Sequence, residues 1–468
     1  MPQSPCTHGI RPPEFPELPW LNTEAPLPLR ELLGKVVLVG FISSSCIRCQ
    51  EGVPLMRRTV ERFSDDELQV IAVHSPRFDG ERDLDYLRLA IRRVGVLAPV
   101  IVDNDHRVAG QFNVRRLPSL ALIDTRGYVC RFFCEVPEPQ KLFDAIVALL
   151  GERDELAPRE EAPPADTPAP RSLSFPGGVT ADDRRLIIAD TGHHRVVIAD
   201  VDGQVQRVVG GPHLGLEDGD ADQARFYAPH GLTLRDDHLV VADTLNQALR
   251  RVDLLTGRTS TFCRVPSPSE SASPAPWSVS AGGSRWYVAC AATHRLMRMD
   301  FDGSHIERYA GTGDEDRIDG HRSRARFAQP TDLVLEDNQL YVIDSSSSAL
   351  RRIDLRTNRV QTLLGQSVFS YGFEDGPGSQ ALLQHPRGLA IYQGTVYIAD
   401  SLNRAVRYFE PAHGELSTLE NPELKFPAAI CATAEGLVVC DAHDHALWRL
   451  DPQGPTWTRL ELTWPDAD

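Results

Sequence analysis

Two cysteines separated by two residues are the strongest chemical signal in this chain. Cys46 and Cys49 form a C-x-x-C motif. Cysteines at this spacing can cycle between a dithiol and a disulfide when the first is held as a thiolate. Half of a zinc site is a competing interpretation, but residues 1–152 contain no second C-x-x-C or C-x-x-H pair to complete it. A pair of inert thiols is the third alternative.

The segments around this motif predict how it is positioned. The apolar run Val36–Ile42 predicts a buried strand, and apolar residues at three- and four-residue intervals over 51–63 predict a helix. Cys46 would then lie at a helix N-terminus, where unpaired N–H groups and the helix dipole favour a thiolate. We expect Cys46 to have a lowered pKa and to be the nucleophile, with some support from Arg48. Cys49, one turn later, would release the product.

The other patterns before residue 152 alternate between strands and helices. They predict strands at 68–74 and 100–102, helices at 84–94 and 140–150, and a hairpin of strands at 119–124 and 128–135. The order β-α-β-α-β-β-α favours one mixed sheet covered by helices on both faces.

From residue 173 onward one pattern occurs six times. Each copy has a proline followed three residues later by an apolar residue, then an apolar strand ending in Ala-Asp or a variant, then a basic-apolar strand. The copies begin at Pro176, Pro229, Pro276, Pro330, Pro386 and Pro427. A repeat of about 49 residues with four short strands is typical of a β-propeller blade. We predict six blades, closed by packing of the first against the last without strand exchange.

These patterns divide the chain into four parts. We expect an N-terminal extension at 1–17, an α/β domain at 18–152, a linker at 153–172 and the propeller at 173–468. The linker segment holds five prolines and four alanines without periodicity, as in semi-rigid spacers.

The repeats resemble the NHL family. Asp243-Thr-Leu-Asn246 and Asp400-Ser-Leu-Asn403 fit the family pattern closely, whereas the third repeat has Cys290 in place of the aspartate. We interpret these aspartates as structural, because a short carboxylate after a strand can accept backbone N–H bonds from the following turn. Calcium binding and catalysis are the alternatives.

The first domain resembles the thioredoxin-like family, in its redoxin-type branch. Pro54 follows Cys49 by five residues, where that family kinks its active-site helix. Leu117-Pro118 precedes the hairpin, where the family places a cis-proline against the C-x-x-C motif. The resemblance implies thiol–disulfide oxidoreductase activity supported by Pro54 and Pro118.

Three positions depart from related patterns. Ser45 replaces the tryptophan usual before the first cysteine, and Gly40 stands where thioredoxins bury an aspartate as proton shuttle. Glu51 or solvent would have to transfer that proton. Val39 occupies the position where a peroxiredoxin needs proline, so that activity is excluded.

Other polar and thiol groups have two interpretations each. His74 ends a predicted strand and either bonds to the backbone or lies near the cysteines. Cys130 and Cys134 are expected to be buried small apolar residues in the hairpin rather than a second dithiol.

The two domains together resemble the family of NHL repeat-containing protein 2 and its bacterial relatives. The resemblance covers nearly the whole chain and implies a multidomain fold, an α/β thioredoxin-like domain followed by an all-β six-bladed NHL-type propeller. It also implies a cytosolic protein with a redox role.

Composition limits the partners. The chain has 49 basic and 65 acidic residues, and only 18 and 20 of these lie in residues 1–152. An acidic propeller argues against nucleic acid binding.

No apolar run approaches the ~20 residues that a membrane helix needs. Residues 1–28 lack the basic and apolar regions of a signal peptide, so we expect a cytoplasmic protein. We expect no cofactor and no metal, and the oligomeric state stays open.

Two functions are therefore in competition. The first is an oxidoreductase that acts on protein disulfides, with the propeller selecting the protein client. The second is a protein-binding scaffold in which the thioredoxin-like domain has become vestigial. Cys46 and Cys49 favour the first function, whereas Gly40 and Ser45 favour the second.

Overall fold

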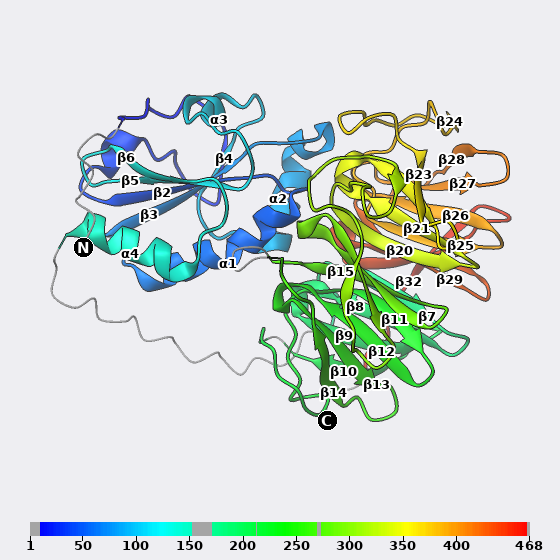
Figure 1. Ribbon diagram of the computed structural model, residues 1–468. Helices are drawn as coiled ribbons and strands as arrows, with labels where there is room; N and C mark the ends of the chain where they lie inside the picture. Colours follow the sequence, from blue (N-terminus) through cyan, green and yellow to red (C-terminus); the bar gives the residue numbers. More distant parts are fainter. Residues whose placement is uncertain (1–9, 152–170, 212, 269–272, 466–468) are drawn as a thin grey trace. The chain divides into compact units, whose positions relative to one another are not determined.

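A computed structural model describes residues 10–151, 171–211, 213–268 and 273–465 (Figure 1). The chain divides into two compact units, residues 1–164 and residues 165–468. Most of the expected N-terminal extension and of the expected linker lies outside the described residues.

The first unit is built on a six-stranded mixed sheet in the order β1-β4-β3-β2-β5-β6. Strands β2, β3 and β4 are parallel to one another, while β1, β5 and β6 each pair antiparallel with their neighbour. The strands are β1 Trp20–Leu21, β2 Val36–Ile42, β3 Leu68–His74, β4 Val100–Val102, β5 Ser119–Ile123 and β6 Val129–Phe133. The helices are α1 Ile47–Arg62, α2 Leu84–Val94, α3 Arg107–Gln111 and α4 Pro139–Leu150, with 3-10 turns η1 Leu29–Leu32 and η2 Asp79–Arg82.

Both faces of this sheet are covered, as the sequence predicts. Alternate residues of β2 and β3 pack against α1, α2 and α4 on one face. On the other face they pack against α3 and the irregular segment 15–29. Because both faces are covered, every residue of β2 is buried. This arrangement is the thioredoxin-like α/β fold.

The second unit is a six-bladed β-propeller, which confirms the predicted number of repeats. Each blade is a separate antiparallel sheet whose four main strands are consecutive in sequence. In order, the blades are β7 Gly178–Ala181, β8 Arg185–Asp190, β9 Arg195–Asp200 and β10 Val205–Gly210; β11 Pro229–Arg235, β12 His238–Asp243, β13 Ala248–Asp253 and β14 Thr259–Arg264; β15 Pro276–Gly282, β16 Arg285–Cys290, β17 Arg295–Asp300 and β18 Glu307–Ala310; β20 Pro330–Glu336, β21 Gln339–Asp344, β22 Ala349–Asp354 and β23 Arg359–Leu364; β25 Gly388–Tyr392, β26 Thr395–Asp400, β27 Ala405–Glu410 and β28 Glu415–Leu419; β29 Pro427–Thr433, β30 Gly436–Asp441, β31 Ala446–Asp451 and β32 Thr456–Leu460. The two-residue strands β19 Gly320–His321 and β24 Gly376–Pro377 extend the outer edges of the fourth and fifth blades.

The ring closes by packing of the sixth blade against the first. The N–H of Phe175 donates to Nδ1 of His445 at 2.9 Å, and β29 lies beside β7. In the part of the propeller that the structure describes, the first and last blades exchange no main strand, as predicted. Beyond β32, however, Thr463 forms a parallel bridge with Gln204, and Val205 N–H donates to the Thr463 carbonyl at 2.9 Å. The last described residues therefore form a small clasp on the first blade.

The repeated aspartates are structural, but their partners differ from those expected. Asp344 accepts the N–H of Ala328, sixteen residues earlier, at 2.6 Å, and pairs with Arg351 at 3.1 Å. The following turn donates to Asp344 through the hydroxyl of Ser347 at 2.9 Å, in place of the expected backbone N–H group. Asp243 with Arg250, and Asp400 with Arg407, form the same fully buried pair in the second and fifth blades.

Candidate functional site

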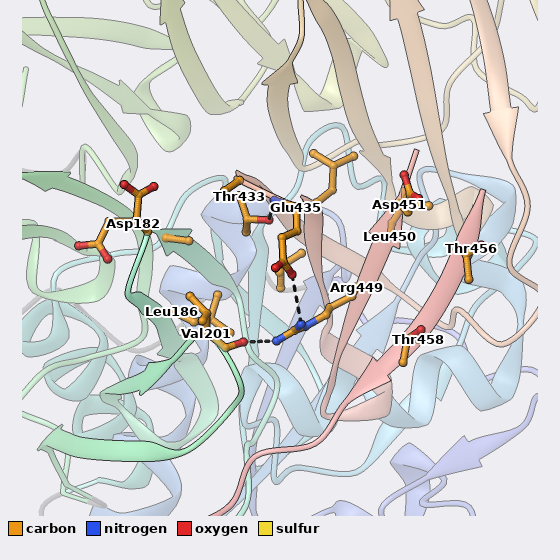
Figure 2. Close-up of a pocket in the computed structure, with 15 residues that line it drawn as sticks. Asp182, Leu186, Val201, Thr433, Glu435, Arg449, Leu450, Asp451, Thr456 and Thr458 are labelled. Carbon is orange, nitrogen blue, oxygen red and sulfur yellow. Dashed lines mark hydrogen bonds and ion pairs between the residues drawn. The ribbon is translucent and has the colours of Figure 1, made fainter. Parts of the chain in front are cut away.

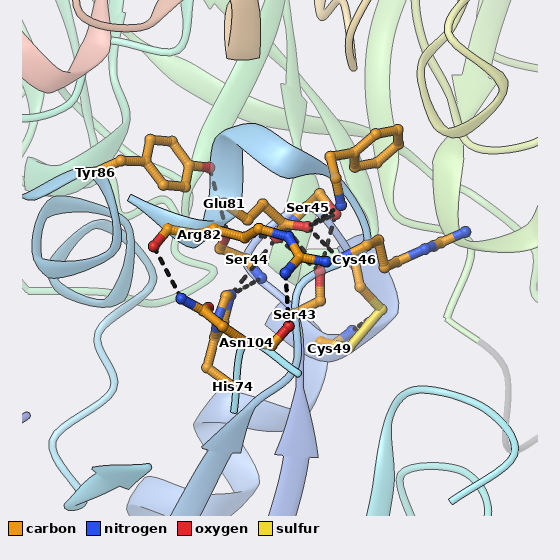
Figure 3. Close-up of polar contacts among 12 residues, drawn as sticks. Ser43, Ser44, Ser45, Cys46, Cys49, His74, Glu81, Arg82, Tyr86 and Asn104 are labelled. Carbon is orange, nitrogen blue, oxygen red and sulfur yellow. Dashed lines mark hydrogen bonds and ion pairs between the residues drawn. A yellow bond between two sulfur atoms is a disulfide. The ribbon is translucent and has the colours of Figure 1, made fainter. Parts of the chain in front are cut away.

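Cys46 and Cys49 lie at the start of α1 and are joined as a disulfide, with their Cα atoms 5.2 Å apart (Figure 3). Cys46 is the N-cap residue of α1, and its Sγ accepts the N–H of Cys49 at 3.2 Å. The two cysteines are only 3% and 2% exposed. The structure thus brings together the predicted pair at a helix N-terminus, where a thiolate is stabilised.

The helix begins four residues earlier than the apolar periodicity predicts. The periodicity starts near residue 51, whereas the first helical residue is Ile47. Cys46 closes the first turn, because its carbonyl accepts the N–H groups of Cys49 at 3.0 Å and Gln50 at 3.2 Å. The polar residues of this first turn carry no apolar pattern, so their helical conformation is not visible in the sequence.

A buried carboxylate holds the loop immediately before Cys46. Glu81, in η2, is 0% exposed and accepts six hydrogen bonds. Four come from the three serines that precede Cys46, and two come from backbone N–H groups of the residues immediately before η2. The donors are Ser43 Oγ (2.8 Å), Ser44 Oγ (2.6 Å) and Ser45 N (2.9 Å) to Oε1, and Ser45 Oγ (3.1 Å), Arg77 N (2.6 Å) and Phe78 N (3.0 Å) to Oε2.

This environment favours the charged form of Glu81. Burial raises the pKa of the Glu81 carboxyl, but His74 and the hydroxyl donors of Ser44 and Ser43 outweigh burial and hold that pKa well below its usual range. The carboxylate therefore stays ionised at neutral pH, as a fixed negative charge inside the domain.

His74 and Tyr86 complete the group of side chains around this loop. The N–H of Ser44 donates to His74 Nε2 at 3.2 Å, and the Ser44 hydroxyl lies 3.3 Å from the Tyr86 hydroxyl. Both interpretations of His74 therefore hold, because its side chain accepts a backbone hydrogen bond and also lies near the loop before Cys46. Glu81 was not expected from the sequence, because an acidic residue in a polar connecting segment is normally exposed.

The predicted supporting residues lie in the first unit as follows. Pro54 is inside α1, where it cannot donate a backbone hydrogen bond. The Leu117–Pro118 peptide bond is cis, as the thioredoxin-like resemblance implies. Arg48 forms an ion pair with Glu135 at 3.4 Å. This carboxylate offsets the charge that Arg48 was expected to provide to Cys46.

The position of the missing thioredoxin aspartate is occupied by another side chain. A Cβ atom added at Gly40 would lie 3.0 Å from both Sδ and Cε of Met56, and 3.3 Å from Leu120. Met56 therefore fills the space beside the strand, and a larger residue at position 40 would require the end of the Met56 side chain to move.

The other cysteines differ in exposure. Cys134 is exposed and Cys130 half-buried, so the expectation that both are buried is wrong; the hairpin strand β6 lies at the sheet edge and ends before Cys134. In the propeller, burial raises the pKa of Cys263 to about 11 and that of Cys431 to about 12. Such thiols are poor nucleophiles at neutral pH.

Described residues of the propeller line two sizeable cavities. One, of about 370 Å³, lies at the seam between the sixth and first blades, where Arg449 donates to the Val201 carbonyl and approaches Glu435 (Figure 2). The other, of about 320 Å³, is lined by the inner strands of all six blades and includes Asp332. Asp332 accepts the hydroxyl of Ser278 at 2.7 Å, so it links neighbouring blades.

Within the described residues, no three His, Cys, Asp or Glu side chains converge as a metal site requires. No helix in these parts of the chain has both the length and the apolar character needed to cross a membrane.

Comparison with known proteins identifies both parts of the chain. The AhpC/TSA family profile matches residues 13–131, and the NHL repeat profile matches residues 173–199. The chain is 31% identical over 511 residues to "NHL repeat-containing protein 2" of Bos taurus, an alignment that covers 95% of this chain and 70% of that protein.

Two other relatives share smaller portions of their own length or of this chain. "Protein SUPPRESSOR OF QUENCHING 1, chloroplastic" of Arabidopsis thaliana is 29% identical over 490 residues, covering 94% of this chain and 46% of that protein. "Thiol-disulfide oxidoreductase YkuV" of Bacillus subtilis is 30% identical over 117 residues, covering 25% of this chain and 77% of that protein. The first domain is thus related to thiol–disulfide oxidoreductases.

Proposed function

Because the chain belongs to the family of NHL repeat-containing protein 2, we propose that it is a thiol–disulfide oxidoreductase whose propeller binds protein clients. The observation that carries this proposal is the Cys46–Cys49 disulfide at the N-terminus of α1. Pro118, Pro54 and Arg48 are proposed as supporting residues of this site.

The proposed reaction is two successive thiol–disulfide exchanges. In the reduced protein, the Cys46 thiolate attacks one sulfur of a client disulfide, forms a mixed disulfide and releases the other client sulfur as a thiolate, which takes a proton from solvent. Cys49, after losing its proton, attacks Cys46 Sγ and releases the second client thiolate. The client gains two electrons, and a separate dithiol reductant must return two electrons to the Cys46–Cys49 disulfide.

The site geometry suits both steps. Cys46 Sγ already accepts one N–H group of α1, so negative charge on this sulfur is stabilised. Cys49 is close enough to form a disulfide with the same sulfur. The propeller cysteines Cys263 and Cys431 form no disulfide, which suits a reducing compartment, and we propose the cytoplasm.

The test is capture of clients as mixed disulfides. In a background that carries Cys134→Ser, to remove the exposed thiol, Cys49→Ser should retain clients on Cys46 in a non-reducing gel. The matched control Cys46→Ser should retain none. Equal capture by the two variants would contradict the exchange reaction and favour the scaffold function.

A further inference from the structure

Glu81 is surrounded entirely by hydrogen-bond donors. Each of its six partners donates to the carboxylate through an O–H or N–H group, three to Oε1 and three to Oε2. Three of the six donors are the backbone N–H groups of Ser45, Arg77 and Phe78, which can only donate, and they reach both carboxyl oxygens. These contacts favour the ionised form of Glu81, because a proton on either oxygen would compete with these N–H donors.

Four of those six bonds connect Glu81 to the residues that lead directly into the nucleophile. Ser43, Ser44 and Ser45 have no more than 4% of their surface exposed. The N–H of Cys46 in turn donates to the carbonyl of Ser43 at 3.2 Å, so the position of this loop fixes the first turn of α1. The segments connected in this way are 36 to 38 residues apart in sequence.

We propose that Glu81 is a positioning residue that holds residues 43–45 and thereby keeps Cys46 at the N-cap of α1. It acts as a fixed anion and does not carry protons. In this respect it differs from the buried aspartate of thioredoxins, whose position is taken here by Gly40. The inference rests on the proposed function for its role in catalysis, but its structural effect on Cys46 can be measured without any client.

Other ionisable groups also lie around Glu81 and the serine loop. His74 Nε2 on β3 lies 3.6 Å from Oε1, and Tyr86 on α2 reaches Ser44. Arg93, also on α2, interacts electrostatically with both Tyr86 and Glu81. Since none of them contacts residues 43–45 with as many bonds as Glu81, we expect their substitution to have smaller effects on Cys46.

Loss of the Glu81 carboxylate should make Cys46 less reactive. Glutamine can accept through one oxygen only, and its NH₂ group would face the N–H of Ser45 or those of Arg77 and Phe78, so at least one of these backbone bonds must be lost. Cys46 would then lose its fixed place beside the N–H of Cys49. A full shift of its pKa from about 7 to about 8.5 would reduce the thiolate fraction at pH 7, and the alkylation rate with it, roughly fifteenfold.

The experiment is a pH titration of Cys46 alkylation by iodoacetamide in the reduced full-length protein, followed by mass spectrometry. Glu81→Gln should raise the alkylation pKa of Cys46. The matched control is Asp103→Asn, which removes another fully buried carboxylate of this domain that accepts Ser75 Oγ and the N–H of Val108. It should leave Cys46 unchanged.

A second variant keeps the test decisive if Glu81→Gln does not fold. Ser44→Ala removes one donor at 2.6 Å and should raise the pKa of Cys46 by a smaller amount. An unchanged or lowered pKa in the folded variants would overturn the proposal, as would an equal shift in Asp103→Asn. Failure of client capture would refute the oxidoreductase function but would leave this titration result standing.

Discussion

Arg351→Met tests the buried Asp–Arg pairs of the propeller. Arg351 is fully buried, and its Nη1 donates to Asp344 at 3.1 Å and to the Arg326 carbonyl at 2.9 Å. Its Nη2 donates to the Ile318 carbonyl at 3.0 Å and to Asp319 at 2.8 Å. Methionine replaces none of these bonds and leaves a buried carboxylate without its cation. We expect the free energy of unfolding of the propeller to fall by about 3–5 kcal/mol.

The third blade supplies the matched control. It has Cys290 where the fourth blade has Asp344, and Met297 where the fourth blade has Arg351, and both are buried. The double variant Asp344→Cys/Arg351→Met therefore copies a combination that this fold already contains. It removes the unpaired carboxylate, so it should be more stable than Arg351→Met by at least about 1 kcal/mol.

Urea unfolding followed by tryptophan fluorescence measures both variants, because five of the six tryptophans lie in the propeller. The comparison needs the two single variants and the double variant under the same conditions, so that the coupling energy can be calculated. If the double variant loses as much stability as the two single variants combined, the aspartate and arginine do not act as a pair and the reasoning is refuted.

Two other predictions concern Asp332, in the cavity lined by the inner strands of the blades, and Gly40, which stands where thioredoxins have an aspartate. Burial raises the pKa of Asp332 to about 6, above the value of about 3.9 in an unfolded chain. The native state then binds the proton of the Asp332 carboxyl more tightly than the unfolded chain does. Protonated Asp332 therefore contributes to the free energy of unfolding below about pH 4, and this contribution is lost as pH rises through 6. Relative to Asp332→Asn, the native protein should lose up to about 3 kcal/mol between pH 4 and pH 7, measured by urea unfolding; a constant difference would refute this. Gly40→Asp should lower stability by about 1–3 kcal/mol, because its Cβ would meet Met56, and should not increase disulfide reduction; a faster variant of native stability would contradict this.

Much of the fold could be predicted because burial leaves a periodic pattern in the sequence. The bounds of β2, β3 and α2 agree with the apolar runs at 36–42, 68–74 and 84–94. Short elements without such a pattern, such as α3 at Arg107–Gln111 and β1 at Trp20–Leu21, were not predicted. Their conformation depends on contacts with distant segments rather than on local periodicity.

Of the candidate site, only the pair Cys46 and Cys49 could be predicted from the sequence. The spacing of Cys46 and Cys49 is visible in the sequence, whereas the support from Glu81 is not. The carboxylate and the serines that it binds lie on two segments that α1 and β3 separate in the sequence, and neither segment has a repeating pattern. In the propeller, likewise, the aspartates were recognised as structural, but their bonds to N–H groups sixteen residues earlier depend on how the blades pack together.

The clasp at Thr463 also affects when the propeller can be completed during synthesis. Its two backbone bonds, from Val205 N–H to the Thr463 carbonyl and from Thr463 N–H to the Gly203 carbonyl, join residue 463 to a blade made some 250 residues earlier. Thr463 cannot make these bonds while it is still inside the ribosomal tunnel. The first blade therefore keeps one flank open until Thr463 has emerged.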